Sequence, residues 1–529
     1  MRKTPMIALP ASRRTFVKAA GGLAASRLFG QAPGVLPGDR PIASYGVMSG
    51  DVIPGRAMVW SRSDRPARML VNWRVGSAGE LRRVVGPHCL ETTDYTGRVE
   101  LTGLPAGETI NYEVQFESLS SARVKSEPVK GTFRTVPSDG RDVRFLWGGD
   151  TCGQGWGIDE SRGGMRCYDT MLRRDADFFI HSGDTIYADG IIEREVAIPA
   201  AIGGGTWKNI VSEEKSKVAE TLADFRGNYK YNLLDTNMRA FNAGVSQIWQ
   251  WDDHEVTNNW SPSKSVATDT RYKEKEVALM VGRATKAFQE YAPLRFSSEE
   301  TDRVYRLIPY GPLVDVFVID MRTYRGPNTF NRQENQSDET AYLGRPQMQW
   351  LQQGLKNSKA VWKVIASDMP IGLNVADGND DQGRPKFEAV ANGNGPALGR
   401  ELEIAELLRF IKFNNIKNTV WFTADVHYTA AHYYDPSKAR FVDFNPFWEF
   451  VSGPLHAGTF GPNPLDDTFG IQVAYQKVPP AGQANLPPSA GMQFFGEVSV
   501  SARTKTMTVT LRDMFNNVLF TQPLDAEGV

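Results

Sequence analysis

The sequence predicts an α/β protein in which a small β-sandwich domain precedes a larger, layered α/β domain. Between residues 41 and 138, short runs of alternating apolar and polar residues are separated by Gly, Pro and Asp turns, the pattern of a strand sandwich. From residue 139 to residue 529, apolar strands alternate with segments of helical periodicity, which is typical of layered α/β folds. The 529 residues are enough for two such domains.

Residues 1–40 are predicted to be an export signal and linker. The stretch SRRTFVK, which contains Arg13, Arg14 and Lys18, precedes a weakly apolar Ala/Gly run and resembles a twin-arginine signal. Such a signal would send the folded protein through the twin-arginine export machinery to the periplasm or out of the cell. The alternative is a basic, disordered tail.

The β-sandwich domain contains five expected strands and one pair of residues with metal-binding chemistry. The segment 101–116 resembles the late hairpin of fibronectin type III and immunoglobulin-like modules. His88 and Cys89 are read as a surface histidine beside a buried thiol, with a metal pair as the alternative. The chain has three cysteines, which allow one disulfide at most. The expected strands cover residues 56–60, 69–75, 96–101, 110–116 and 129–136.

The larger domain is predicted to contain five helices and two closing strands. The closing strands are expected at 494–502 and 506–513. Residues 369–399 and roughly 435–490 lack a regular pattern, and irregular segments of this length are usually lids or binding loops. The helices are expected at 165–175, 218–241, 274–292, 345–358 and 400–414.

The composition excludes several classes of partner. The formal net charge is −1, so no overall electrostatic attraction favours nucleic acid or an anionic membrane, and we expect no nucleic-acid-binding module. No apolar run approaches the ~20 residues of a membrane span, so we expect no transmembrane segment.

Six predicted strands of the larger domain end in aspartate. If these strands share one sheet edge, their acids converge, because ligands of α/β sheets bind beyond the carboxyl ends of the strands. Carboxylates a few ångströms apart do not all stay ionised without cations, and multivalent metal supplies them. For a single aspartate the alternative is a helix or turn cap, and that explanation weakens with each added strand. The aspartates are Asp150, Asp184, the pair Asp252 and Asp253, Asp320, Asp368 and Asp425.

Four further side chains lie within three residues of one of these aspartates. They offer nitrogen, sulfur and phenolic oxygen, which complete a mixed ligand set or act in catalysis. They are Cys152, Tyr187, His254 and His427.

The motifs that contain these residues resemble those of one enzyme family. WDDHE has the form of the G-N-H-E box of calcineurin-like metallophosphoesterases, and ADVH has the form of their closing G-H-x-H box. GDTIY is similar to the G-D-x-x-Y stretch of purple acid phosphatases. With VIDMRTYR, the preceding β-sandwich and the export signal, the chain resembles the PhoD family of alkaline phosphatases and phosphodiesterases, from about Tyr45 to the last strands.

The resemblance implies a fold, cofactors and a ligand set. The implied core is a four-layer αββα metallophosphoesterase sandwich, and the implied cofactors are Fe³⁺ and two Ca²⁺. Asp184 would be the bridging carboxylate, while Cys152 and Tyr187 would be anionic ligands of the ferric ion. The implied metal ligands are Asp150, Cys152, Asp184, Tyr187, Asp253, Asp425 and His427.

The predicted function is metal-dependent hydrolysis of phosphate monoesters, diesters or both. A metal-activated hydroxide would attack phosphorus, and His254 would protonate the leaving oxygen unless it only supports the site. Asp252 would orient His254 or help hold a metal. Arg322 would bind phosphate as a fork or form an ion pair with Asp320. No role follows from the sequence for His181, His432, His456 or Asp368.

Three other functions remain open at this point. A phospholipase D-like diesterase would have an exposed apolar rim around its site, and a non-catalytic envelope-binding protein would have lost one of the metal boxes. A nucleotidase would carry asparagine where this chain has Asp253.

Overall fold

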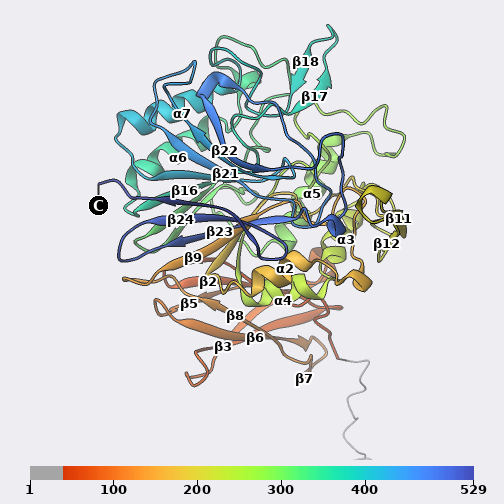
Figure 1. Ribbon diagram of the computed structural model, residues 1–529. Helices are drawn as coiled ribbons and strands as arrows, with labels where there is room; N and C mark the ends of the chain where they lie inside the picture. Colours follow the sequence, from red (N-terminus) through yellow and green to blue (C-terminus); the bar gives the residue numbers. More distant parts are fainter. Residues whose placement is uncertain (1–39, 529) are drawn as a thin grey trace, which may run out of the picture.

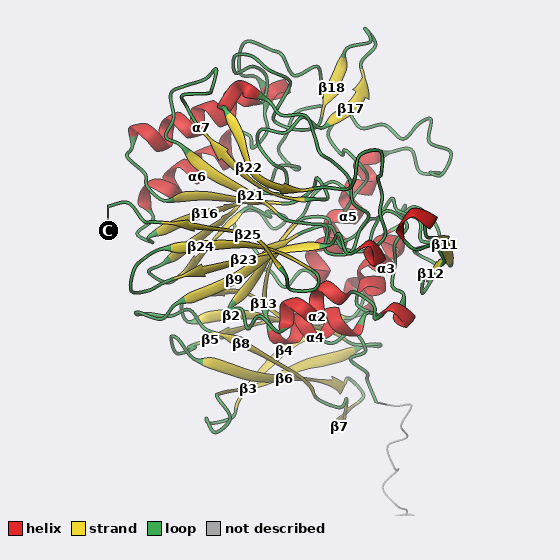
Figure 2. Cartoon of the chain, viewed as in Figure 1, coloured by secondary structure: helices red, strands yellow, loops and turns green. Residues whose placement is uncertain are grey.

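The computed structural model describes residues 40–528, so the predicted twin-arginine signal lies outside the described residues apart from its last position. Within this range the chain forms three large sheets and two short hairpins, with helices packed on the sheets (Figures 1 and 2). The N-terminal strands β3 and β6 lie at one end of the molecule, and the sheet that contains β16 and β21 lies at the other (Figure 1).

The first large sheet has four parallel strands at its centre and antiparallel strands on both sides. Strands β9, β10, β13 and β1 run parallel, and all residues of β10 and β13 are buried, the polar ones included. In spatial order the sheet comprises β25 (Val518–Leu524), β24 (Met507–Asp513), β23 (Phe494–Val500), β9 (Val143–Gly148), β10 (Phe178–Ser182), β13 (Ser246–Gln250), β1 (Val47–Ile53), β2 (Arg56–Arg62) and β5 (Thr96–Thr102).

The second large sheet repeats this arrangement. Strands β15, β16, β19 and β21 are parallel, and the remaining strands are antiparallel to their neighbours. In spatial order it comprises β14 (Arg306–Tyr310), β15 (Val314–Val318), β16 (Trp362–Ala366), β19 (Thr419–Thr423), β21 (Phe447–Val451), β20 (Thr429–Tyr434) and β22 (Ile471–Lys477).

Aromatic side chains pack these two sheets against each other. The ring of Phe422 from β19 lies 4.5 Å from that of Trp147 and 5.6 Å from that of Phe145, both on β9. The six strands that precede the aspartates are therefore divided equally, with β9, β10 and β13 in one sheet and β15, β16 and β19 in the other. The six strands therefore do not share one sheet edge, and their acids converge from two facing sheets.

The third sheet packs against strands β2 and β5 of the first sheet. Met69 and Val71 of β3 belong to the same buried core as Val59 of β2 and Leu101 of β5. Strands of the region 41–138 are thus shared between this sheet and the first large sheet, which continues past residue 138 into β9. The sheet comprises β4 (Arg82–Cys89), β3 (Ala67–Val75), β6 (Thr109–Ser118), β7 (Ser121–Lys125) and β8 (Val129–Arg134).

Helices pack on the faces of the two large sheets that point away from each other. The sides of α2 and α4 contact Leu146 and Phe179 of the first sheet, and those of α3 and α5 contact Trp249. In the second sheet, Phe317 and Trp421 pack against α6 and α7. The helices are α2 (Arg166–Leu172), α3 (Leu222–Asn232), α4 (Thr236–Gly244), α5 (Val277–Tyr291), α6 (Arg345–Asn357) and α7 (Glu401–Phe413).

All five predicted helical segments are helical, but one contains a break. The segment 218–241 divides into α3 and α4 because the Asp235 carboxylate accepts a hydrogen bond from the Met238 backbone N–H and caps a new helix. The segments without a regular pattern contain only the hairpin β17 (Ala376–Asn379) and β18 (Pro385–Phe387) and two short 3₁₀ turns, among the described residues, besides strands β21 and β22. A second hairpin pairs β11 (Glu195–Ala197) with β12 (Thr206–Lys208).

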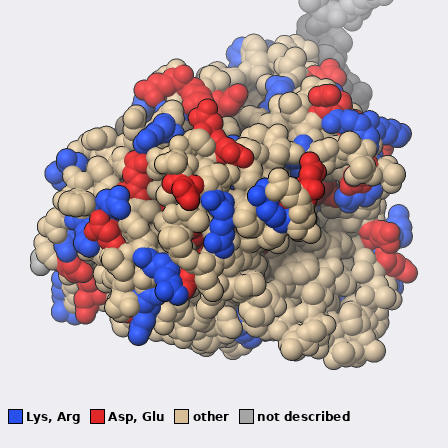
Figure 3. All heavy atoms as spheres, turned by 90° about the horizontal axis from the view of Figure 1, so that it is seen from above, with Lys and Arg blue, Asp and Glu red and all other residues tan. Residues whose placement is uncertain are grey.

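The structure bears on the expectations about membrane-spanning segments, surface charge and the cysteines. Over residues 40–528, none of the helices combines the length and apolar character needed to cross a membrane. Positive and negative side chains are interspersed on the face shown in Figure 3, in keeping with the small net charge. Cys89, Cys152 and Cys167 are all buried and unpaired in the described part of the chain. Nε2 of His88 accepts hydrogen bonds from the Arg68 guanidinium at 3.1 and 2.7 Å.

Candidate metal centre

The candidate centre lies where the strands of the two facing sheets end. Four of its residues adopt left-handed backbone conformations, which turn the chain sharply as it leaves a strand and which non-glycine residues seldom adopt. They are Asp150, Asp184, Asp425 and His427, with φ between 52° and 66°. Such conformations cost energy and are concentrated at functional sites.

Five of the predicted ligands, together with Asp252 and His254, form three overlapping groups. Within each group, one potential ligand atom per residue lies within 4.8 Å of those of the other two. Asp184 belongs to the first and second groups, and Asp253 belongs to the second and third, so the three groups form one continuous cluster. The groups are Asp150 with Asp184 and His427, Asp184 with Asp253 and His254, and Asp252 with Asp253 and Asp425.

Asp150 provides the strongest indication that a cation belongs here. The residue is fully buried, and neither of its carboxylate oxygens has a hydrogen-bond partner among residues 40–528. Burial raises the pKa of this carboxyl group to about 8. The chain also approaches it closely, because a Cβ atom on Gly453 would lie 2.2 Å from an Asp150 oxygen. An unpartnered buried carboxylate is costly, and a metal ion would satisfy it.

Tyr187 contacts His427, a member of the first group. The hydroxyl of Tyr187 lies 2.9 Å from Nε2 of His427, and Nδ1 of His427 faces the carbonyl oxygen of Gly458. Burial lowers the pKa of His427 to about 4, so the ring is neutral and Nε2 is available as a ligand. The carbonyl fixes the ring orientation, as is typical of metal-binding histidines.

Asp184 is held by the tight turn that follows β10. Gly183 has a φ of 95°, and a Cβ atom there would lie 2.5 Å from Cβ of Asp252. Only glycine therefore lets the two strand ends come this close. Burial, partly opposed by His254, raises the pKa of Asp184 well above its ordinary range.

His254 has a partner that the sequence analysis did not identify. Its Nδ1 lies 2.6 Å from a carboxylate oxygen of Asp189, whose second oxygen accepts a hydrogen bond from the Asn258 backbone N–H at 2.8 Å. Burial alone would raise the pKa of Asp189, but the nearby His254 imidazole brings it down to about 2. Asp189 thus orients His254, while Asp252, expected either to orient His254 or to help hold a metal, lies in the third ligand group. The only sequence signal was its position two residues after Tyr187.

Arg322 is enclosed by carboxylates. Its side chain is 0% exposed, and its guanidinium pairs with Asp252, Asp368 and Glu388. The expected partner Asp320 instead accepts backbone hydrogen bonds from Arg322 and Thr323, both at 2.9 Å. Arg322 therefore compensates buried negative charge beneath the metal groups, and Glu388, from the unpatterned segment 369–399, is a site residue that sequence reasoning missed.

We expect Arg322→Met to destabilise the protein strongly. Removing the cation leaves Asp252, Asp368 and Glu388 buried without a partner, and breaking a buried ion pair from one side typically costs about 3–5 kcal/mol. Burial already raises the pKa of Asp252, so protonation at lower pH should reduce the deficit. Denaturant unfolding at pH 8 and pH 5 measures both effects. An unchanged midpoint at pH 8 would show that the carboxylates are compensated by other means.

Cys152 joins none of the three groups and, unlike Tyr187, has no side-chain hydrogen bond to a member of them. Its side chain is fully buried in an apolar cluster with Ile158 and Met165, and burial raises the pKa of the thiol to about 12. Its backbone N–H donates to the carbonyl oxygen of His456 at 3.0 Å, which connects this turn to the loop after β21. The left-handed φ of 63° matches the strained backbone of the other strand ends.

The histidines without an assigned role are buried supports of the surrounding loops. His181 lies 2.8 Å from the Thr151 hydroxyl, and burial lowers its pKa to about 3. His456 lies 2.9 Å from the carbonyl oxygen of Gly157, and His432 lies 3.1 Å from Glu449 in the second sheet.

Glu255, which the sequence analysis also missed, accepts hydrogen bonds from the backbone N–H groups of Thr185 and Asp252. It therefore connects the turns after β10 and β13.

A polar cleft of about 520 Å³ opens beside this centre. It is lined by Tyr187, Asp189 and His254 together with the loop that follows His254. Side chains of His254 and Asp425 are 11% and 12% exposed, whereas Asp252 is 0% exposed, so solvent reaches the cluster near these two residues.

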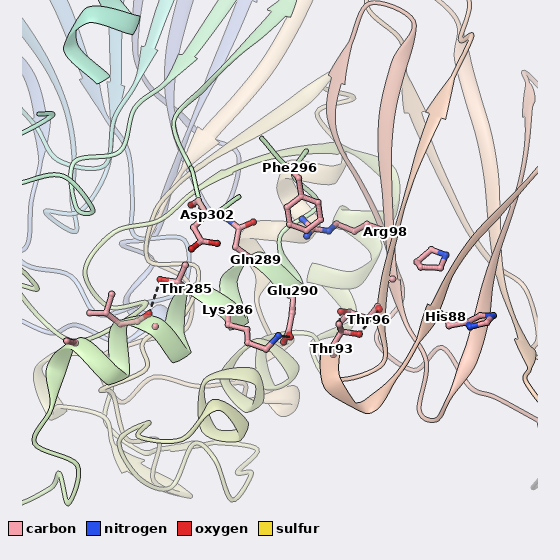
Figure 4. A pocket seen from close by; sticks show the side chains of 15 residues that line it. His88, Thr93, Thr96, Arg98, Thr285, Lys286, Gln289, Glu290, Phe296 and Asp302 are labelled. Carbon is pink, nitrogen blue, oxygen red and sulfur yellow. Dashed lines mark hydrogen bonds and ion pairs between the residues drawn. The ribbon is translucent and has the colours of Figure 1, made fainter. Parts of the chain in front are cut away.

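A second cavity, of about 860 Å³, lies between the β4–β5 region and α5 and shares no residue with the metal groups (Figure 4). Three of its charged side chains, Arg98, Lys286 and Glu290, are already engaged. The guanidinium of Arg98 lies 3.8 Å from the centre of the Phe296 ring and donates to two carbonyl oxygens, and Glu290 pairs with Lys286 and Arg226. It is separate from the candidate centre.

Two protein-family models and one bacterial relative match the chain. Residues 145–511 match the model of the PhoD-like phosphatase family, and residues 30–137 match the N-terminal domain of PhoD-like phosphatases. The chain is 26% identical over 492 residues to alkaline phosphatase D of Bacillus subtilis (strain 168), covering 86% of this chain and 78% of that protein.

Two solved structures share the fold. A structure of PhoD superposes with a TM-score of 0.65 at 21% identity, covering 91% of this chain and 89% of the other. The purple acid phosphatase PPD1 from yellow lupin seeds superposes with a TM-score of 0.55 at 12% identity, covering 92% and 74%. Both support a mixed α/β fold preceded by β-sandwich-like strands.

Proposed function

The chain belongs to the PhoD-like phosphatase family and is an enzyme of the PhoD type, and from this premise we propose that it hydrolyses phosphate monoesters, diesters or both with the metal cluster described above. The observation that carries the proposal is the buried, unpartnered Asp150 carboxylate within three overlapping groups of potential ligands. Family membership removes the non-catalytic envelope-binding protein from the alternatives. The polar lining of the cleft beside His254 favours small polar esters over a phospholipase D-like reaction on lipids.

We assign Fe³⁺ and two Ca²⁺ to this cluster. Tyr187, His427, Asp150 and Asp184 offer phenolic, imidazole and carboxylate donors that suit a ferric ion, while Asp252, Asp253 and Asp425 offer the oxygen donors that calcium prefers. Cys152 follows Asp150 by two residues and is retained as a further proposed iron ligand. When bound, the metals would lower the pKa of a water molecule and neutralise charge on the phosphoryl oxygens.

The chain's own contribution to the chemistry centres on His254. Asp189 fixes the ring through Nδ1, so Nε2 is the atom from which a proton would pass to the leaving oxygen. Burial lowers the pKa of His254, but the carboxylates of Asp189, Asp253 and Asp184 outweigh this and raise it well above its usual value. Asp189, which lies outside the ligand groups, favours the protonated ring, the form that leaving-group protonation requires. We also propose that the protein is periplasmic or secreted and is exported by the twin-arginine route.

Metal analysis tests the proposal directly. We expect at least one iron and one or more calcium ions per chain, because the buried carboxylates need several positive charges. Elemental analysis of the purified protein measures this content, and tyrosinate or thiolate bound to Fe³⁺ should give a visible charge-transfer band. Chelation should remove hydrolysis of both monoesters and diesters. A colourless, active protein that contains only zinc would contradict the iron assignment, and activity unaffected by complete metal removal would contradict the mechanism.

A further inference from the structure

The cleft beside His254 is lined by three separate segments of the chain. Gln154 and Gly155 come from the turn after β9, residues 187–191 follow the turn after β10, and residues 257–271 form the loop after β13. If His254 protonates the leaving oxygen, the departing alcohol lies against this lining. Its chemistry therefore bears on which leaving groups the enzyme accepts.

Charged side chains of the lining are paired, with one exception. Asp189 binds His254 at 2.6 Å, and Arg271 binds Asp269 through two nitrogens, the shortest contact being 2.7 Å. Lys264 has neither an ion pair nor a side-chain hydrogen bond to any residue in the range 40–528. Its ammonium group thus gives this cleft a positive charge that the described protein does not neutralise.

The loop that bears Lys264 is fixed to the body of the protein. The backbone N–H of Lys264 donates to the carbonyl oxygen of Ser261 at 2.9 Å, and Val266 is buried in the core with the first sheet's aromatic residues. Nζ of Lys275 then binds the carbonyl oxygens of Val266 and Asp269 at 3.1 and 2.8 Å. Lys264 is itself partly buried and lines the cleft.

We propose that Lys264 binds a second phosphate group carried by the leaving alcohol. An ammonium ion is a common partner of phosphate, and its attraction is strengthened in a partly enclosed cleft. The enzyme should therefore prefer phosphate esters whose alcohol bears a further phosphate over esters of uncharged alcohols. This inference rests on the proposed phosphatase function and adds a substrate class to it.

The test compares two esters of the same carbon chain. Metal-loaded enzyme is assayed with butane-1,4-diyl bisphosphate and with butyl phosphate, and the ratio of their kcat/KM values is measured. Lys264→Ala should lower this ratio about tenfold through a higher KM for the bisphosphate, while Lys264→Arg should retain most of it. Added salt should lower the wild-type ratio as well, since it screens the ammonium–phosphate attraction.

Lys273 supplies the matched control. It lies on the same loop, is exposed, and does not belong to the described lining of the cleft. Lys273→Ala should leave the ratio unchanged.

Equal losses with both esters in Lys264→Ala, or an unchanged ratio, would overturn the inference and leave the phosphatase proposal standing. A metal-loaded wild type that hydrolyses neither ester, nor any other phosphate ester, would overturn the proposed function and this inference with it.

Discussion

Replacement of Asp184 by asparagine is expected to abolish most hydrolysis and to cost the protein at least one metal ion. Asp184 belongs to two of the three ligand groups, so its negative charge serves more than one metal position. Asparagine keeps the volume and removes the charge. Loss of one well-placed electrostatic group lowers turnover by roughly 10²–10³-fold, and metal loss should deepen the effect. The measurement is kcat/KM together with elemental analysis of the same preparation.

The same substitution at the other end of β10 provides the control. Asp177 is also buried, but its carboxylate pairs with Arg141 and accepts from the Arg144 backbone N–H at 2.9 Å, away from the metal groups. Asp177→Asn should affect stability without changing the metal content. Near-normal turnover and full metal content in Asp184→Asn would mean that Asp184 serves only the turn after β10.

His254→Ala should slow hydrolysis of alkyl phosphates far more than hydrolysis of nitrophenyl phosphate. An alkoxide needs a proton as it leaves, whereas a nitrophenolate leaves readily without one. General acid catalysis typically contributes about 10²–10⁴-fold, so the alkyl ester should lose activity in that range. The comparison of kcat/KM for the two esters measures the difference.

The metal content of His254→Ala separates the alternatives. If His254 acts as the acid, bound metal should remain unchanged. Equal losses with both esters, accompanied by metal loss, would identify His254 as a ligand or structural support. Unchanged activity with both esters would mean that the box containing His254 lies outside the active site.

The sequence predicted which segments form helices and strands more accurately than it predicted which strands pair with one another. The apolar run before Asp184 and the helical period of 345–358 reflect local contacts, and both elements form where expected. The division of the acid-bearing strands between two sheets could not be seen locally. Strands β13 and β15 are similarly buried, yet only their long-range hydrogen bonds decide which sheet each one joins.

Some residues of the candidate site could be predicted from the sequence, and others could not. Aspartates at strand ends could be recognised because strand ends of an α/β protein position ligands. Glu388 could not, since it follows a hairpin in a segment without a regular pattern and meets Arg322 only in the folded chain. Asp189 lies in a turn whose sequence predicts no direction for its side chain, so its contact with His254 was likewise visible only in the structure.

The strand order of the first sheet has a consequence for biosynthesis. Gly50 of β1 pairs with Gln247 of β13, and Val143 of β9 pairs with Val500 of β23, so partners are synthesised far apart in time. Contacts of such high sequence separation form slowly, and the sheet edge of β9 stays open until nearly the whole chain has left the ribosome. The turn that bears Asp150 follows directly after β9. The nascent chain is therefore exposed to edge-to-edge association until its C-terminal strands arrive, and the turn that bears Asp150 joins a completed sheet only at that stage.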